Sequence, residues 1–186
     1  MGMGEPLKNL DNVAEALSRL TGPLGFSPRR ITLSTSGLVK ELLILPKVAP
    51  HVNIAISLNA TTDEVRDRIM PVNRKHPIRE LMAACRKYPL EPRRRITFEY
   101  VMLRGVNDTP EDAHRLTGLI KGIQSKVNLI PFNEFPGSDF RRPTDEAALR
   151  FQSILTGRGC TMLIRKSKGA DILAACGQLG AGHKAS

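Results

Sequence analysis

The sequence is poor in aromatic residues and has no closely spaced cysteines. Aromatic side chains make up 4% of the 186 residues and Trp is absent, which argues against a recognition surface built on stacked rings. Cys85, Cys160 and Cys176 lie far apart in the sequence. Metal sites use close pairs of cysteines, and an odd number of them argues against a disulfide framework. This pattern favours a reducing compartment, and we expect a cytoplasmic protein.

Long hydrophobic runs are also absent. No apolar stretch approaches the roughly 20 residues that a helix needs to cross a bilayer. The opening Met1-Gly2-Met3-Gly4 lacks the charged and apolar regions of a signal peptide. Hydrophobic residues at 41% and charged residues at 25% are ordinary for a soluble globular protein. We therefore expect no membrane partner.

Acidic residues are outnumbered by basic ones. The sequence has 28 Lys and Arg against 18 Asp and Glu, so the formal net charge is +10. A basic surface attracts polyanions because phosphate neutralisation releases counterions. Charge alone does not separate nucleic-acid-binding proteins from other basic proteins.

Predicted strands and helices alternate along the chain. Short apolar, β-branched runs predict strands over residues 31–36, 53–58, 95–103, 127–131 and 161–165. Amphipathic spacing and end signals predict helices over residues 12–20, 63–69, 78–88, 110–123 and 145–156. Such alternation indicates an α/β fold with a parallel sheet and right-handed crossovers.

Polar residues cluster where the predicted strands end. They are Ser34-Thr35-Ser36-Gly37, Ser57-Leu58-Asn59-Ala60 and Pro131-Phe132-Asn133. No strand is followed by the Gly-x-Gly-x-x-Gly fingerprint of dinucleotide-binding folds. In parallel barrels, functional residues collect at strand ends, so a partial barrel is favoured. Ser and Thr at strand ends also bond the local backbone without any ligand, and both interpretations stay open.

Several segments together resemble one family. Met1-Gly2-Met3-Gly4-Glu5-Pro6-Leu7 contains a Gly-Glu-Pro motif, and the chain closes with Ala174-Ala175-Cys176-Gly177-Gln178-Leu179. With these, the strand-end segments and Glu99-Tyr100-Val101-Met102-Leu103 resemble the radical S-adenosylmethionine (SAM) adenine-C2 RNA methyltransferases, the RlmN/Cfr family. The sequence as a whole is more similar to the RlmN type than to the Cfr type.

The resemblance implies a fold and a function. The fold is a partial TIM-type (β/α) barrel with its N-terminal strands missing, over residues 1–170, followed by a catalytic-cysteine loop and tail over residues 171–186. The function is SAM-dependent radical methylation of adenine C2 in 23S rRNA and tRNA, carried out by a monomer. This chemistry also requires a [4Fe–4S] cluster.

The resemblance also implies binding residues for SAM, which are Gly4, Glu5, Ser34, Ser57, Leu58, Asn59 and Asn133. Hydroxyl and amide groups at a barrel mouth can bond ribose or carboxylate oxygens. Taken alone, the Gly-Glu-Pro motif has a simpler explanation, as a turn that closes a strand. Many relatives have His where this chain has Asn59, and Asn cannot act as an acid or base.

Cys176 is the expected catalytic residue. The resemblance implies that it accepts a methyl group from SAM and becomes S-methylcysteine, from which carbon is transferred to adenine. A lone cysteine is more often a small buried hydrophobe, which is our expectation for Cys85 and Cys160.

The cluster ligands that this chemistry needs are missing from the sequence. A [4Fe–4S] cluster is held by a Cys-x-x-x-Cys-x-x-Cys triplet, and the chain contains none. The resemblance places the triplet upstream of Gly-Glu-Pro, so we expect no metal ligands here and no activity from the chain alone. A non-catalytic basic RNA-binding remnant, or a radical-SAM enzyme with another substrate, remain as alternatives. Candidate phosphate contacts are residues 93–95, 141–142 and 165–168.

Overall fold

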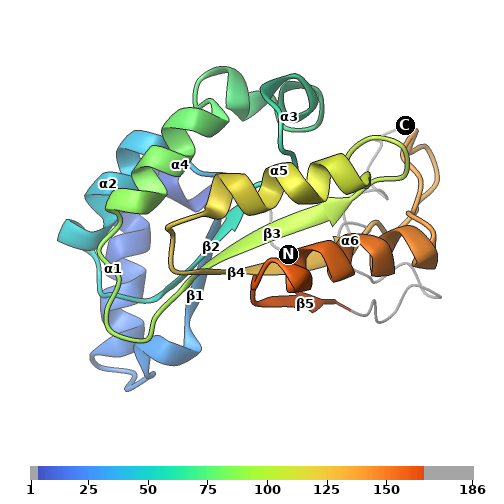
Figure 1. Cartoon of the computed structure of the whole chain (residues 1–186). Coiled ribbons are helices and arrows are strands. Elements are labelled where there is room, and N and C mark those ends of the chain that lie inside the picture. Colours follow the sequence, from blue (N-terminus) through green and yellow to red (C-terminus); the bar gives the residue numbers. More distant parts are fainter. Residues whose placement is uncertain (1–3, 166–186) are drawn as a thin grey trace.

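We describe residues 4–165 in a computed structural model of the chain (Figure 1). Within them lies one sheet of parallel strands, in the order β1-β2-β3-β4-β5. The strands are β1 (Thr32–Thr35), β2 (Asn53–Ser57), β3 (Ile96–Met102), β4 (Ser125–Pro131) and β5 (Met162–Ile164). All of them fall where the sequence predicts strands, with ends that differ by a few residues.

The helices are α1 (Leu10–Thr21), α2 (Val39–Val48), α3 (Asp63–Ile69), α4 (Ile78–Lys87), α5 (Pro110–Ile120) and α6 (Asp145–Gly157). The predicted helices are present, but the sequence patterns did not indicate α2. Apolar residues cover much of this helix, and Pro46 lies within its last turn. A proline in the last turn removes one backbone donor and its ring crowds the carbonyl four residues earlier, and α2 ends two residues after Pro46. None of the described helices is both long and apolar enough to span a membrane.

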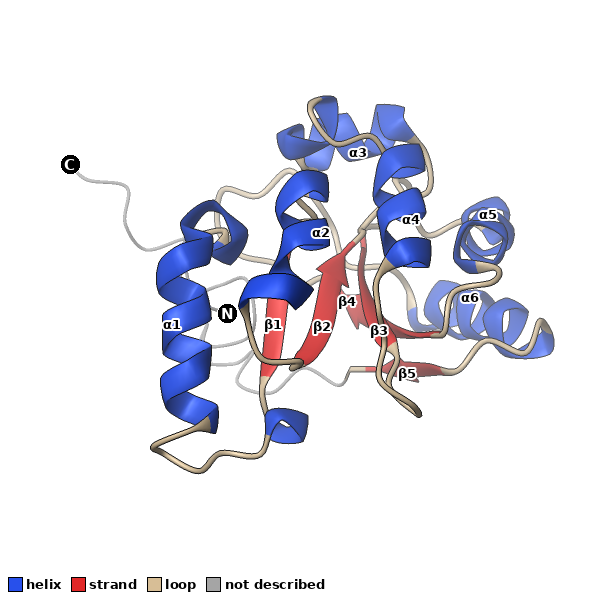
Figure 2. Cartoon of the chain, turned by 90° about the vertical axis from the view of Figure 1, so that its left-hand side faces the viewer, coloured by secondary structure: helices blue, strands red, loops and turns tan. Residues whose placement is uncertain are grey.

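The strand order identifies a partial barrel. Each strand pairs with the next one along the chain, whereas a doubly wound sheet reverses its order at a switch point. Because crossovers between parallel strands share one hand, the connecting helices collect on one face of the sheet. Figures 1 and 2 show the helices along that outer face. The expected barrel architecture is confirmed.

Apolar and polar side chains alternate along the strands and give the sheet two different faces. Large apolar side chains such as Ile56, Phe98 and Leu129 are buried in the core with the helices. The intervening positions carry Ser57, Glu99 and Asn128, which are neighbours in register. Since successive side chains of a strand point to opposite faces, these polar residues share the inner face of the partial barrel.

Candidate functional site

A pocket of about 650 Å³ lies at the carboxyl ends of β1 and β2. Five of the expected SAM-binding residues line it: Gly4, Glu5, Ser34, Ser57 and Asn59. Its lining also includes Thr35 and Ser36 of the predicted strand-end cluster, and Met70, which the sequence did not single out. Parallel strands bring their carboxyl ends to one edge of a sheet, which explains why segments so distant in sequence meet here. We call this cavity the carboxyl-end pocket.

Glu5 ties the first described segment to the end of β1. Its carboxylate accepts four hydrogen bonds, from Leu7 N at 3.0 Å, Thr35 Oγ1 at 2.6 Å, and Ser36 N and Oγ at 2.7 Å each. Four donors match the lone-pair sites of an ionised carboxylate. The Glu5 side chain therefore shapes the pocket wall.

Two glycines allow the backbone to turn beside Glu5. Gly4 has φ +100° and Gly37 has φ +91°, values that side-chain-bearing residues rarely adopt. At Gly37 a Cβ would also lie 2.5 Å from Leu81 Cδ1 in the core. The Gly37 amide donates to Thr35 Oγ1 at 3.0 Å, so this turn orients the hydroxyl that binds Glu5.

Glu99 of β3 is an acidic side chain beside the pocket that the sequence analysis did not identify as a site residue. Ser34 Oγ donates to Glu99 Oε2 at 3.1 Å, across β2. The Glu99 side chain is on the same face as Ser57, its register partner, and the residue is 9% exposed. A carboxylate at an inward position of a buried strand was the signal that could have revealed it.

Asn59 closes the end of β2 with both its backbone and its side chain. Its φ of 57° is left-handed, a conformation that Asn tolerates better than most residues. Oδ1 accepts from Val101 N at 2.9 Å, and Nδ2 contacts Met70 Sδ at 3.1 Å. The Asn59 carbonyl accepts from Asn107 Nδ2 at 2.7 Å. Asn59 thus joins β2 to β3 at the pocket edge.

Arg66 of α3 has the largest fully buried side chain among residues 4–165, with 0% exposure. Its guanidinium donates to five acceptors, four of which are backbone carbonyls: Leu58, His76, Ser36 and Ser57. Burial lowers the pKa of Arg66 to about 10, which leaves the side chain charged at neutral pH. The arginine therefore fixes the ends of β1 and β2 relative to each other.

Carboxylates support Arg66 through an amide. The fifth acceptor is Asn73 Oδ1 at 2.9 Å, and Asn73 Nδ2 donates to Asp63 Oδ1 at 3.0 Å and Asp67 Oδ1 at 2.7 Å. Asp63 and Asp67 both raise the pKa of Arg66 against the effect of burial. A buried charge is tolerated when it is surrounded by such partners.

The other expected site residues lie differently. Leu58 is fully buried in the core, and its amide donates to the Glu99 carbonyl at 3.0 Å. Asn133 follows β4 and is 6% exposed, but it is not among the residues that line the carboxyl-end pocket. Cys176 and the rest of the 171–186 segment lie outside the described residues.

The two described cysteines do not fit an iron–sulfur cluster. Burial raises the pKa of Cys85 to about 12 and also raises that of Cys160. A raised pKa makes these thiols harder to convert to the thiolate that binds metal. Between residues 4 and 165, no group of three or more His, Cys, Asp or Glu side chains is placed to hold a metal.

Two of the expected phosphate-binding arginines sit beside a carboxylate. Arg141 Nη1 lies 3.6 Å from Glu134 Oε2, and the Arg142 amide donates to Glu134 Oε1 at 2.8 Å. The charge of Arg141 is therefore partly compensated within the protein, whereas the Arg142 guanidinium donates to the neutral Phe132 carbonyl at 3.4 Å. Arg165 is the last described residue, and the rest of the 165–168 segment is outside the described part.

Comparisons with known proteins agree with this architecture. The family model of the radical SAM superfamily matches residues 1–117. The chain is 58% identical over 181 residues to the dual-specificity RNA methyltransferase RlmN of Syntrophotalea carbinolica, covering 96% of this chain and 48% of that protein. RlmN of Geobacter sulfurreducens is also 58% identical, with 50% of it covered. The chain spans about half the length of these relatives.

Solved structures show the same fold. A radical SAM methyltransferase from Sphaerobacter thermophilus superposes with a TM-score of 0.90 at 46% identity, over 96% of this chain and 53% of that one. A domain of pyruvate-formate lyase-activating enzyme from Bacteroides vulgatus gives a TM-score of 0.65 at 17% identity, over 89% and 97% of the two chains. The second similarity shows the fold alone.

Proposed function

The chain belongs to the radical SAM superfamily, and from that premise we propose that it forms the SAM-binding part of an RNA adenine-C2 methyltransferase. The observation that carries the proposal is the convergence of Gly4, Glu5, Ser34, Ser57 and Asn59 on one pocket. The 58% identity to RNA methyltransferases supports the choice of reaction within the superfamily.

The residues of the carboxyl-end pocket fit SAM. Its volume of about 650 Å³ lies in the range of small-molecule sites. We propose that the backbone of Gly4 and Glu5 receives the ammonium group, since the Glu5 carboxylate is already bonded to four donors. The hydroxyls of Ser34 and Ser57 would bind ribose or carboxylate oxygens. When bound, SAM supplies the methyl group and the radical chemistry.

Other residues would act through the shape of the site. Arg66 holds the carbonyls of Ser36 and Ser57 at 2.7 and 3.2 Å, so it positions both strand ends without facing the ligand. Asn59, which bonds Val101 and Met70, would set the width of the pocket. Asn133, buried after β4, and Leu58 are retained as proposed contacts on the resemblance alone.

We propose Cys176 as the residue that carries the methyl group, as S-methylcysteine, to adenine C2. The support is the match of its surrounding segment to the family, since it lies outside the described residues. Cys85 and Cys160 are poorer nucleophiles because burial raises the pKa of both thiols. They serve as internal controls for this assignment.

The proposed substrates are 23S rRNA and tRNA. The net charge of +10 suits a polyanion, and the relatives are described as dual-specificity RNA methyltransferases. A cluster would be held by residues outside the described part of the chain.

The test is nucleoside mass spectrometry for 2-methyladenosine in cells that lack this modification. The cells would express the chain joined to the remaining part of the Syntrophotalea carbinolica relative, with Cys176→Ala and Cys160→Ala as paired variants. We expect 2-methyladenosine from the parent and from Cys160→Ala, and none from Cys176→Ala. A soluble fusion that holds its cluster but produces no 2-methyladenosine would refute the proposed reaction.

One observation favours a second function for the chain by itself. The sequence is strongly basic, as a non-catalytic RNA-binding protein could be. That alternative predicts RNA binding by the chain together with failure of every fusion to methylate.

A further inference from the structure

Basic residues gather at the amino ends of the strands, opposite the carboxyl-end pocket. In a parallel sheet, the residues that precede the strands share one edge. Exposed cations precede four of the five strands: Arg29 and Arg30 before β1, Arg93 and Arg95 before β3, Lys121 before β4 and Arg158 before β5. Segments far apart in sequence thus bring positive charge to one edge.

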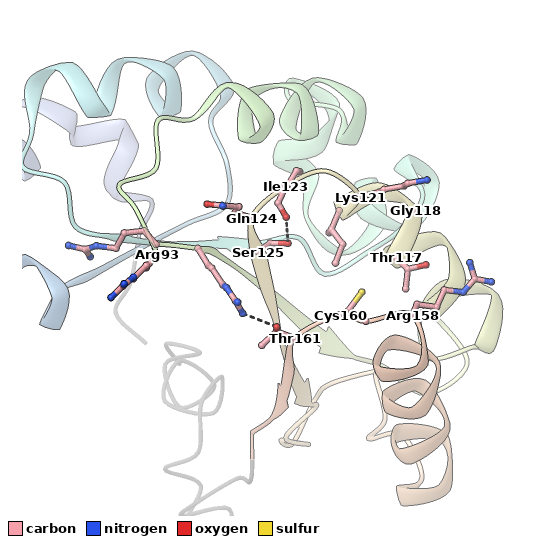
Figure 3. Close-up of a pocket in the computed structure, with 14 residues that line it drawn as sticks. Arg93, Thr117, Gly118, Lys121, Ile123, Gln124, Ser125, Arg158, Cys160 and Thr161 are labelled. Carbon is pink, nitrogen blue, oxygen red and sulfur yellow. Dashed lines mark hydrogen bonds between the residues drawn. The ribbon is translucent and has the colours of Figure 1, made fainter.

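A pocket of about 710 Å³ lies within this basic region, and we call it the amino-end pocket. Its fourteen lining residues include four arginines and one lysine, and none of them is Asp or Glu. Figure 3 shows Arg93 and Arg158 on opposite sides of the pocket, with Thr161 between them. The pocket is therefore positively charged on more than one wall.

One arginine of the pocket has a structural role. Arg94 donates to Asn53 Oδ1 at 2.7 Å and pairs with Glu91 Oε2 at 3.2 Å, and its side chain is 14% exposed. These contacts hold the loop before β3 against β2. The Arg94 guanidinium is thus largely occupied by contacts within the protein.

The neighbouring cations of the pocket make no ion pair within the described residues. Arg95 Nη1 donates to Thr161 Oγ1 at 2.8 Å, which orients its guanidinium toward β5. Among residues 4–165, the ion pairs involve Arg19, Arg94, Arg115, Arg141 and Arg150, and so none involves Arg95, Lys121 or Arg158. Uncompensated like charges in one pocket repel each other, and an anion that enters would relieve this repulsion.

We propose that the amino-end pocket binds the phosphodiester backbone of the RNA substrate. The proposal rests on the proposed function, because it assigns a second contact to the same RNA. Arginine suits phosphate since its fork can donate two parallel hydrogen bonds to phosphate oxygens. Contacts of this kind position an RNA without reading its sequence.

The separation of the two pockets sets the size of that RNA. β3 has seven residues, and a strand rises about 3.3 Å per residue, so the two ends of the sheet lie roughly 20 Å apart. An RNA that reaches both pockets must therefore extend roughly 20 Å beyond the target adenine, and a stem that runs along the outside of the domain would span that distance.

The test compares two triple variants of the full chain with equal loss of charge. The pocket variant is Arg95→Gln, Lys121→Gln and Arg158→Gln. The control variant is Lys40→Gln, Arg79→Gln and Arg150→Gln, which removes exposed cations from helices. Fluorescence anisotropy with a folded, tRNA-sized RNA would be recorded across a salt series.

We expect the pocket variant to bind RNA about 10- to 100-fold more weakly at low salt, and the slope of log K against log salt to fall by about 2 to 3. The control variant should lose about threefold or less. Equal weakening of the two variants would overturn the proposal, since it would mean that only overall charge matters.

The outcome is separable from that of the proposed function. RNA affinity is measured without methyl transfer, whereas 2-methyladenosine formation reports the reaction. A pocket variant that loses RNA affinity in a chain whose fusion never methylates would retain the phosphate site and reject the reaction. A methylating fusion whose KM for RNA is unchanged by the three substitutions would retain the proposed reaction and reject the phosphate site.

Discussion

The two ends of the sheet use polar residues in opposite ways. At the carboxyl end, the charged side chains are bonded within the protein: Glu5 accepts four hydrogen bonds and Arg66 donates to five acceptors. At the amino end, Arg95, Lys121 and Arg158 are exposed and make no ion pair within the described residues.

This difference matches the ligands that we assign to each end. A small ligand that must be held for chemistry requires a preorganised site, whose polar groups are fixed by their neighbours before binding. A long polyanion is attracted by charge and tolerates less exact placement. Substitutions should therefore affect stability at the carboxyl end and RNA affinity at the amino end.

The largest stability effect is expected at Arg66. Replacing it by Met leaves its backbone acceptors at the ends of β1 and β2 without a donor, so Arg66→Met should lower the free energy of unfolding by about 3–5 kcal/mol. Arg68→Met is the matched control on the same helix, because Arg68 is exposed and its guanidinium lies over the Phe140 ring, 5.6 Å from the centroid. Its expected cost is about 1 kcal/mol or less. Urea unfolding measures both, and equal costs would contradict the role of Arg66.

At Asn59, two substitutions separate backbone conformation from side-chain bonding. Asn59→Ala loses the bond to Val101 N at 2.9 Å and retains a Cβ at φ 57°. It should cost about 2 kcal/mol, and Asn59→Gly about 1 kcal/mol less because glycine adopts left-handed backbone freely. Thermal unfolding followed by circular dichroism ranks them. Equal values would show that the backbone conformation has no energetic weight.

Asp112 offers a pH-dependent test next to the carboxyl end. Burial favours its neutral form, but hydrogen bonds from Thr61, Thr109 and Arg115 outweigh this and lower the pKa of Asp112. A lowered carboxyl pKa stabilises the fold above the unfolded-state value of about 3.9, and the contribution is lost as pH falls through the folded-state pKa.

Asp112→Asn should therefore cost about 1–2 kcal/mol at pH 7, and the difference from the parent should shrink below about pH 4. Denaturant unfolding at several pH values is the appropriate measurement. A difference that persists unchanged at pH 3 would show that the charge of Asp112 does not contribute.

The smallest stability effect is expected at the amino end. The combined Arg95→Gln, Lys121→Gln and Arg158→Gln substitutions should change the free energy of unfolding by about 0.5 kcal/mol or less, because the three side chains are exposed and the hydrogen bond from Arg95 to Thr161 is itself exposed to solvent. A loss of several kcal/mol would mean that these cations hold the fold together.

Much of the architecture could be predicted from the sequence, because the alternation of strand and helix patterns and the polar residues at strand ends are local signals. Ser34, Ser57 and Asn59 converge as expected, since parallel strands must bring their carboxyl ends together. The helix α2 was missed because apolar residues cover much of it and Pro46 interrupts the pattern.

The supporting residues could not be predicted in the same way. Arg66 lies among charged residues in a short helix and reads as exposed, yet the chain folds the ends of two strands over it. Glu99 becomes a site residue only through pairing with Ser34, which is 65 positions away. The partners in such long-range contacts depend on the completed fold, even where a carboxylate within a buried strand marks one of the two residues.

The central claim is that SAM binds at the carboxyl end of the sheet and RNA at the amino end. Its most direct test is the affinity for SAM, measured by isothermal titration on the fusion with the remaining part of the relative. Ser34→Ala combined with Ser57→Ala should weaken SAM binding by about 10- to 100-fold, since each lost hydrogen bond costs about 1 kcal/mol. The amino-end triple variant should bind SAM as the parent does. Unchanged affinity in the serine variant, or an equal loss in the amino-end variant, would contradict the assignment of SAM to the carboxyl end.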